Sequence, residues 1–144
     1  MSITQISVFV ESRPGHLTRT LEAFAEAGIQ VRGFCAGDTG EYGIVRFIVD
    51  RPDAAMALLA ERGAAARTSE VLCARLDDRP GALARAMAAC AQAGINIVYC
   101  YSLAATCIAL SVKDIASAEA ALADADIDLV DQAELARVLA GATL

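Results

Sequence analysis

Two short segments of the sequence place arginine, proline and glycine before a leucine, and this combination suits the binding of a small anionic group. They are Arg13-Pro14-Gly15-His16-Leu17 and Arg79-Pro80-Gly81-Ala82-Leu83. Proline pre-sets the backbone for the first turn of a helix, and the short side chain of Ser12 or Asp78 can cap that turn. The first N–H groups of a helix have no intrahelical partner and carry a partial positive charge, so a ligand carboxylate or carbonyl can bind to them. Glycine at position 15 or 81 lets a ligand reach the backbone without meeting a Cβ atom.

Two kinds of side chain beside these turns can also contact a ligand. Asp77 or Asp78 can receive an ammonium group. His16 can donate to a ligand or act as a pH-sensitive contact, but we favour a solvated residue in the first turn of a helix. Polar side chains of different kinds therefore accompany the two turns.

A second matched pair of segments shows that the turns belong to an internal repeat. Ala27-Gly28-Ile29-Gln30-Val31 returns as Ala93-Gly94-Ile95-Asn96-Ile97, at the same shift of 66 residues that relates the two turns. From the third strand onward the shift falls to 63 residues, so the second copy lacks three residues in a hairpin. We predict two modules, residues 1–70 and residues 71–144, with no linker between them.

Hydrophobic periodicity gives both copies the order β-α-β-β-α-β. In the first copy we predict a strand through Ile6 and Val10, a helix from Leu17 to Gly28, strands Gln30–Cys35 and Tyr42–Val49, a helix Pro52–Arg62 and a strand Ala65–Val71. In the second copy we predict a first strand that continues directly from the last strand of the first copy, through Glu70–Leu76. It is followed by a helix from Leu83 to Gly94, strands Asn96–Leu103 and Ile108–Val112, a helix Ile115–Ala123, a strand Ile127–Val130 and a closing helix Ala133–Leu139. This order predicts an α+β fold of two tandem ferredoxin-like modules, each a four-stranded antiparallel sheet with its helices on one face.

Each first helix carries an apolar stripe that we expect to face the sheet. The stripes are Leu17, Leu21, Phe24 and Gly28, and at the same shift Leu83, Met87, Cys90 and Gly94. Gly28 and Gly94 suit helix ends because glycine adopts the left-handed conformation found there. The stripe makes Cys90 a buried, inert thiol.

Tyr99 and Tyr101 flank Cys100 on the second strand of the second copy. Side chains alternate along a strand, so the two tyrosines share one face and Cys100 takes the other. The tyrosines can line a pocket or an interface, or they can simply pack on the sheet, and both readings stay open.

These motifs resemble the ACT domain. The resemblance rests on Glu11-Ser12-Arg13-Pro14-Gly15-His16-Leu17, on Asp77-Asp78-Arg79-Pro80-Gly81-Ala82-Leu83, and on the Ala-Gly-Ile-Asn-Ile and Ala-Gly-Ile-Gln-Val segments that follow each first helix. It covers nearly the whole chain and is nearer to the stand-alone tandem ACT proteins that carry no enzyme domain.

The resemblance implies a regulatory module that binds an amino acid, often at an interface between two domains. The contacts it implies come from the turn after the first strand and from the start of the second strand. In the second copy these are Asp77, Asp78, Arg79, Pro80, Gly81, Ala82, Leu83, Asn96 and Ile97. In the first copy they are Ser12, Arg13, Pro14, Gly15, His16, Leu17 and Gln30. The second copy fits the ligand-binding pattern better because it has Asp78 and Asn96.

The net charge and the cysteine content of the chain lead to expectations about its binding partners and its cellular compartment. The net charge is −6 and no Lys/Arg cluster occurs, so we expect neither nucleic acid nor an anionic membrane as a partner. The five cysteines form no C-x-x-C pair and the chain has one histidine, so we expect no metal and no cofactor. No export signal precedes the first strand, and we expect reduced thiols in a cytoplasmic protein.

Three functions are weighed. The first is an ACT-type regulatory protein that senses a free amino acid, forms a homodimer and modulates a partner enzyme or transporter. The second is a structural adaptor that binds no ligand and uses ACT-type sheet pairing. The third is an enzyme, which we do not expect, because no catalytic triad, metal cluster or phosphate loop is visible.

Overall fold

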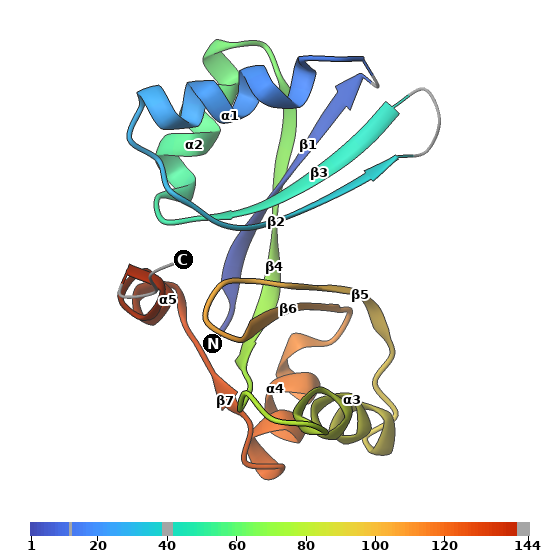
Figure 1. The fold of residues 1–144 in the computed structure, drawn as a ribbon. Helices are drawn as coiled ribbons and strands as arrows, with labels where there is room; N and C mark the ends of the chain where they lie inside the picture. The colour runs from blue at the N-terminus through green and yellow to red at the C-terminus, as the bar shows by residue number, and fades with distance from the viewer. Residues whose placement is uncertain (12, 39–41, 141–144) are drawn as a thin grey trace. The chain divides into compact units, whose positions relative to one another are not determined.

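The computed structural model describes residues 1–11, 13–38 and 42–140. The chain divides into two compact units. The N-terminal unit is Thr4–Ser69, and the C-terminal unit combines Met1–Ile3 with Glu70–Leu144. Each unit is a sheet with helices packed on it (Figure 1).

The N-terminal unit follows the predicted order of elements. These are β1 (Ile3–Glu11), α1 (His16–Glu26), β2 (Val31–Asp38), β3 (Tyr42–Val49), α2 (Pro52–Glu61) and β4 (Ala65–Arg75). The strand order is β2-β3-β1-β4, and α1 and α2 lie on one face of the sheet (Figure 1). This is the ferredoxin-like arrangement expected from the sequence.

The C-terminal unit repeats this arrangement and adds a helix. Its further elements are α3 (Ala82–Gln92), β5 (Ile97–Ser102), β6 (Cys107–Val112), α4 (Ile115–Asp124), β7 (Asp128–Leu129) and α5 (Gln132–Ala140). Antiparallel pairing joins β5 to β6, β6 to β4 and β4 to β7. The last strand of the first copy and the first strand of the second copy are therefore one strand, β4, as the missing linker predicts.

Equivalent residues build the two cores, and several of them differ in size. In the N-terminal unit Phe24 meets Phe47 edge to face, with ring centroids 5.3 Å apart. At the position of Phe24 the C-terminal unit has Cys90, which is also buried. The burial of Cys90, predicted from its place on the stripe, is confirmed, and desolvation raises the pKa of its thiol.

The predicted apolar stripes are partly wrong. Leu21 is 37% exposed and Leu83 is 51% exposed. In α3 the side chains that face the sheet are Ala82, Ala86 and Cys90. In α1 the buried side chains are Ala23 and Phe24, so in both helices the face that meets the sheet is turned away from Leu21 or Leu83.

Both first helices end as the glycines predict. Gly28 has φ 71° and Gly94 has φ 72°, the left-handed conformation. The next N–H group then reaches back across the helix end, from Ile29 to Phe24 O and from Ile95 to Cys90 O, at 2.9 Å in each case. These paired bonds complete the helix end and direct the chain into the following strand.

The second hairpin is the shorter one. In it Ala105 and Thr106 adopt positive φ values of 56° and 58°, and Leu103 N–H donates to Cys107 O at 2.7 Å. In the first copy the turn predicted at Gly37-Asp38-Thr39-Gly40 begins too early, because Gly37 and Asp38 are the last residues of β2. Thr39 and Gly40 lie outside the described residues.

The closing helix is confirmed as α5, which begins at Gln132. Asp131 Oδ1 accepts from Glu134 N–H at 2.7 Å and so caps this helix. Leu135 is fully buried, whereas the side chains of Val138 and Leu139 lie outside the described part of the chain. Over the described residues, no helix has the length and apolar character needed to cross a membrane.

Candidate functional site

The two Arg-Pro-Gly segments form the same tight turn. Gly15 has φ 88° and ψ −11°, and Gly81 has φ 89° and ψ −10°. His16 N–H donates to Arg13 O and Ala82 N–H donates to Arg79 O, both at 3.3 Å. Proline in the second place and a left-handed residue in the third define a type II turn, and only glycine adopts that third conformation without strain.

The helix caps differ from the prediction. Asp78 was expected to cap α3, but the N-cap residue is Gly81 and no side chain bonds to this helix end. The α1 cap is likewise Gly15, without a side-chain bond, and Ser12 lies outside the described residues. The reason is the type II turn, which moves the helix start past the aspartate. Among the described residues, therefore, no side chain accepts from the first N–H groups of α1 or α3.

The arginine of each turn folds back on the preceding acid. Arg13 Nε lies 2.8 Å from Glu11 Oε2, and Arg79 Nη2 lies 3.1 Å from Asp77 Oδ2. These exposed pairs add little stability, but they occupy the Asp77 carboxylate. Among the described residues Asp78 makes no ion pair, so it is the acid of the second turn that is open to a ligand ammonium group.

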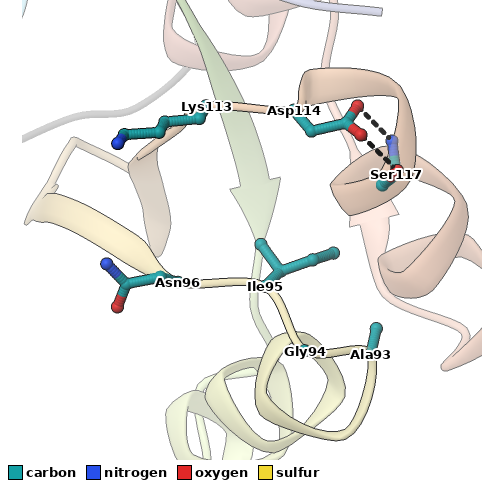
Figure 2. A pocket seen from close by; sticks show the side chains of 7 residues that line it. All are labelled: Ala93, Gly94, Ile95, Asn96, Lys113, Asp114 and Ser117. Carbon is teal, nitrogen blue, oxygen red and sulfur yellow. Dashed lines mark hydrogen bonds between the residues drawn. The ribbon is translucent and has the colours of Figure 1, made fainter.

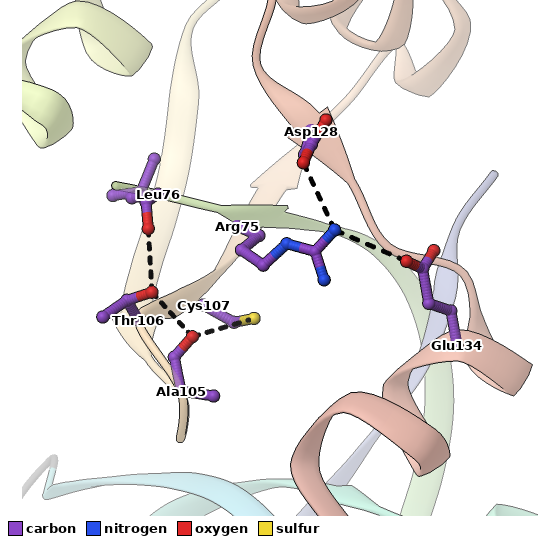
Figure 3. Close-up of polar contacts among 7 residues, drawn as sticks. All are labelled: Arg75, Leu76, Ala105, Thr106, Cys107, Asp128 and Glu134. Atoms are coloured by element: carbon purple, nitrogen blue, oxygen red, sulfur yellow. Dashed lines mark hydrogen bonds and ion pairs between the residues drawn. The ribbon is translucent and has the colours of Figure 1, made fainter. Parts of the chain in front are cut away.

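A pocket of about 450 Å³ lies beside the second turn. Its lining combines the turn with the end of β5 and the start of β6: Leu76, Asp77, Asp78, Arg79, Pro80, Ala82, Leu83, Ser102, Leu103, Thr106, Cys107 and Ile108. Neither Ser102 nor Thr106 was predicted as a site residue. Thr106 Oγ1 donates to Leu76 O at 2.8 Å, which ties the β5–β6 hairpin to the strand that leads into the turn (Figure 3).

The equivalent pocket beside the first turn has a volume of about 410 Å³. Here Gly37 and Gly43 stand where the second pocket has Leu103 and Thr106. His16 lines this pocket, and its Nε2 atom lies 2.8 Å from Arg13 Nη2. Because a guanidinium group has no acceptor, Nε2 accepts this bond, and His16 is held by the turn itself.

The structure does not bring the two halves of the predicted site together within one unit. Asn96 lines a different pocket from the Asp78–Leu83 turn, and Gln30 does not line the pocket of the first turn. The eleven-residue helix α3 separates Asn96 from the turn. At 1.5 Å per residue, its ends lie about 16 Å apart. Ile97 packs partly buried against the core.

The pocket that contains Asn96 lies where α3 ends and α4 begins, and it has a volume of about 380 Å³. Its lining residues are Ala93, Gly94, Ile95, Asn96, Lys113, Asp114 and Ser117 (Figure 2). The side chains of Lys113 and Asn96 extend on one side of Ile95, and Asp114 lies on the other side beside Ser117 (Figure 2). We call it the α3 C-terminal pocket.

Tyr99 and Tyr101 share one face of β5, as alternation predicts. Their rings are stacked with centroids 6.5 Å apart and planes inclined by 14°. Cys100 is exposed and pairs with Leu110 on the opposite face. Neither tyrosine lines one of the pockets described above.

Two buried thiols lie on the face of the second sheet that turns away from α3 and α4. Cys73 alternates with Leu72 and Ala74, which pack into the helix-side core. A hydrogen bond to Cys107 and burial raise the pKa of the Cys73 thiol. Arg75 lies close by and pairs with Asp128 at 3.2 Å and with Glu134 of α5 at 3.5 Å (Figure 3).

A family model described as an ACT domain pair matches residues 1–139. The chain belongs to the ACT domain pair family. The resemblance to tandem ACT domains and the predicted fold class are thereby confirmed.

The chain is similar to three proteins of known structure. Protein BT0572 of Bacteroides thetaiotaomicron is 27% identical with a TM-score of 0.89, over 95% of this chain and 97% of that chain. The ligand-free regulatory subunit of aspartate kinase from Thermus thermophilus is 23% identical with a TM-score of 0.64, over 85% of this chain and 89% of that one. Aspartate kinase from Synechocystis is 25% identical with a TM-score of 0.55, over 98% of this chain but only 26% of its own. No curated protein sequence matches the chain significantly.

Proposed function

We propose that this ACT domain pair, built from modules 1–70 and 71–144, is a regulatory protein that binds a free amino acid at its Arg-Pro-Gly turns. The supporting observation is the type II turn, in which Gly81 leaves the first N–H groups of α3 without a side-chain cap beside a pocket of about 450 Å³. The ligand carboxylate binds these N–H groups, and Asp78 receives the α-ammonium group. The N-terminal unit offers the same arrangement without an acid at the position of Asp78.

The separation of the turn from Asn96 favours a dimer. In the ACT family ligand contacts come from both places, and α3 holds them about 16 Å apart in this unit. A complete site then needs the turn of one module and Asn96 of another, and we propose that a second copy of the chain supplies it. A partner enzyme or transporter is regulated if the ligand favours one assembly over the other.

Thermal unfolding with each of the twenty standard amino acids tests the proposal. A ligand at a hundredfold excess over its Kd stabilises the folded state by about 2.7 kcal/mol, so the midpoint rises by several degrees. Gly81→Val is expected to abolish this rise, because a side chain both strains the turn and fills the approach to the N–H groups. Gly15→Val is the matched control and leaves a response at the second turn.

Three outcomes count against the proposal. The sensor is excluded if no amino acid raises the midpoint. The turn is excluded as the site if Gly81→Val and Gly15→Val both respond like the natural chain. Dimer assembly is tested by light scattering with and without the amino acid that binds, and a monomer under both conditions contradicts the shared site.

A structural adaptor is the second candidate, because large apolar side chains are exposed on strands at the sheet edges. Phe34 on β2 is 55% exposed and Val98 on β5 is 53% exposed. An unpaired edge strand with apolar side chains can pair with another chain. A concentration-dependent dimer whose midpoint responds to no amino acid would favour this candidate.

A further inference from the structure

The helices α1 and α3 end in the same geometry but leave different surroundings for their last carbonyl groups. Gly28 and Gly94 differ by one degree in φ, and the bonds that close the two helix ends have the same length. The C-terminal end of a helix carries a partial negative charge on its unpaired carbonyls, which attracts a cation. The two ends are therefore matched acceptors for a positively charged group.

In the N-terminal unit the chain supplies that cation itself. Arg51 Nη2 donates to Ala27 O at 3.0 Å and to Gly28 O at 2.7 Å. The preceding residue supplies an anion, since Asp50 Oδ1 accepts from Gln30 N–H at 2.9 Å. Consecutive residues thus place a carboxylate and a guanidinium group against the helix end and the start of β2.

In the C-terminal unit the same two positions carry the opposite charges. Asp50 is replaced by Lys113 and Arg51 by Asp114, at the shift of 63 residues that relates α2 to α4. The Asp114 carboxylate turns to α4, where it accepts from Ser117 N–H at 3.1 Å and from Ser117 Oγ at 2.6 Å. It therefore cannot replace the guanidinium group, and as an anion it would not bind the carbonyls.

The space that Arg51 fills is consequently open beside α3. A Cβ atom built on Gly28 would lie 3.4 Å from Arg51 Nη2, whereas one built on Gly94 meets no heavy atom within 4 Å. The α3 C-terminal pocket occupies this space, with Lys113 and the Asn96 side chain toward one side and Asp114 toward the other (Figure 2). The pocket thus carries a positive and a negative side chain. Lys113 stands at the position of Asp50, and Asp114 stands at the position of Arg51.

We propose that the α3 C-terminal pocket binds a small zwitterion that replaces the Asp50 and Arg51 side chains of the N-terminal unit. Its guanidinium or ammonium group donates to the carbonyls of Ala93 and Gly94, next to the Asp114 carboxylate. Its carboxylate accepts from Asn96 N–H, next to Lys113. This site lies at the opposite end of α3 from the Arg-Pro-Gly turn, so it does not depend on binding at the turn.

L-Arginine is the probe, because it carries a carboxylate and the guanidinium group that the N-terminal unit uses. Titration calorimetry is expected to show binding, and amide shifts in a nitrogen-15 NMR spectrum are expected at residues 93–96. Agmatine, which lacks the carboxylate, is expected to bind roughly tenfold to a hundredfold more weakly, as the loss of a charge-assisted hydrogen bond implies. No L-arginine binding at millimolar concentration would overturn the proposal.

Two exchanges of side chains test the copy-to-copy relation directly. Lys113→Asp with Asp114→Arg gives the C-terminal unit the pair of the N-terminal unit, and is expected to fill the pocket and abolish binding at residues 93–96. Asp50→Lys with Arg51→Asp is the reverse exchange and is expected to open a second pocket, so that shifts also appear at residues 27–30. Arg85→Asp with Asp124→Arg exchanges charges on exposed positions of α3 and α4 and is the matched control, expected to leave binding unchanged.

The outcomes separate this proposal from the proposed function. Shifts confined to the first turn of α3, or shifts at residues 93–96 that disappear in Gly81→Val, would support a ligand at the Arg-Pro-Gly turn shared with Asn96 of a second copy, and would overturn the α3 C-terminal pocket. Binding that persists at residues 93–96 in the Lys113→Asp, Asp114→Arg variant would also overturn it. The reverse exchange remains informative if that variant fails to fold, since no gained site at residues 27–30 contradicts the relation.

Discussion

The two units have the same backbone conformation at both ends of their first helices, but different side chains surround the C-terminal ends of these helices. Each has a left-handed glycine at the start of its first helix and another at its end, with φ values that agree within one degree. The side chains around the helix end do not agree, because Arg51 bonds to it in one unit and Asp114 turns away from it in the other. Backbone geometry and ligand chemistry are therefore separate properties of this fold.

The difference teaches where a binding site can arise without a change of fold. In the N-terminal unit the guanidinium group of Arg51 occupies the end of α1. In the C-terminal unit Asp114 stands at the equivalent position, and a pocket with charged side chains lies at the end of α3. Glycine keeps the backbone in place in both cases because its conformation is accessible to few other residues. Comparison of the two copies thus identifies candidate ligand-binding positions that could not be recognised from one copy alone.

The largest difference that we predict between the units is in the helix–sheet core. Phe24→Ala removes the ring that packs on Phe47 and is expected to lower the free energy of unfolding by about 3–5 kcal/mol. Cys90→Ala, at the equivalent buried position, removes one sulfur atom and is expected to cost about 1 kcal/mol. Unfolding of both variants in guanidinium chloride measures the two free energies. Equal losses of unfolding free energy would show that the two positions contribute equally to the stability of their cores.

A second difference is the closing helix, which follows only the C-terminal unit. Leu135 of α5 is fully buried, so Leu135→Ala is expected to cost about 2–3 kcal/mol. Because Glu134 of the same helix lies near Cys73 and Cys107, loosening α5 should raise the rate at which these thiols react with a disulfide reagent. Arg137→Ala, on the exposed side of α5, is the control. Unchanged thiol rates in Leu135→Ala would show that α5 does not protect the pair.

Most of the fold followed from the sequence because the signals were local and occurred twice. The alternation through Val8 and Val10, the glycine stops and the 66-residue shift place strands and helices to within a few residues. The burial of individual side chains was harder to predict from the sequence, as the exposed Leu21 and Leu83 show. Which flank of an alanine-rich helix meets the sheet depends on how closely the two backbones approach, and periodicity does not contain that distance.

The candidate site was predictable only in part. The Arg-Pro-Gly turns were found from residue types alone, but the cap assigned to Asp78 was wrong because a type II turn and a proline-initiated helix share the same residues. Thr106 and Ser102 reach the turn pocket through strand pairing, which links residues far apart in sequence. A sequence signal did exist for Lys113 and Asp114, since the 63-residue shift aligns them with Asp50 and Arg51.

A third prediction tests whether the two turns are equal. Gly81→Ala places a side chain on a left-handed residue and is expected to cost about 1–2 kcal/mol. A Cβ atom there meets nothing within 4 Å, and at Gly15 the nearest atom is Arg19 Nη2 at 3.9 Å, so both costs arise from the backbone. The two alanine variants should therefore lose stability equally, within about 0.5 kcal/mol. Gly81→Asn should lose less, because asparagine tolerates this conformation, and unequal losses at positions 15 and 81 would break the equivalence of the turns.

The smallest predicted effect concerns the cap of α4, which has no counterpart on α2. Hydrogen bonds from Ser117 Oγ and N–H lower the pKa of Asp114 below its usual value. The ionised carboxylate therefore holds the cap above that pKa, and the cap is lost as the pH falls through it. An NMR titration should give a low midpoint for the amide of residue 117, and Ser117→Ala, which keeps the N–H bond alone, should move the midpoint up toward the usual value of an aspartate. Ser111→Ala leaves these bonds intact and should not move the midpoint. An unchanged midpoint in Ser117→Ala would mean that the hydroxyl does not orient Asp114, and the charge that faces the α3 C-terminal pocket would then be free to turn toward a ligand.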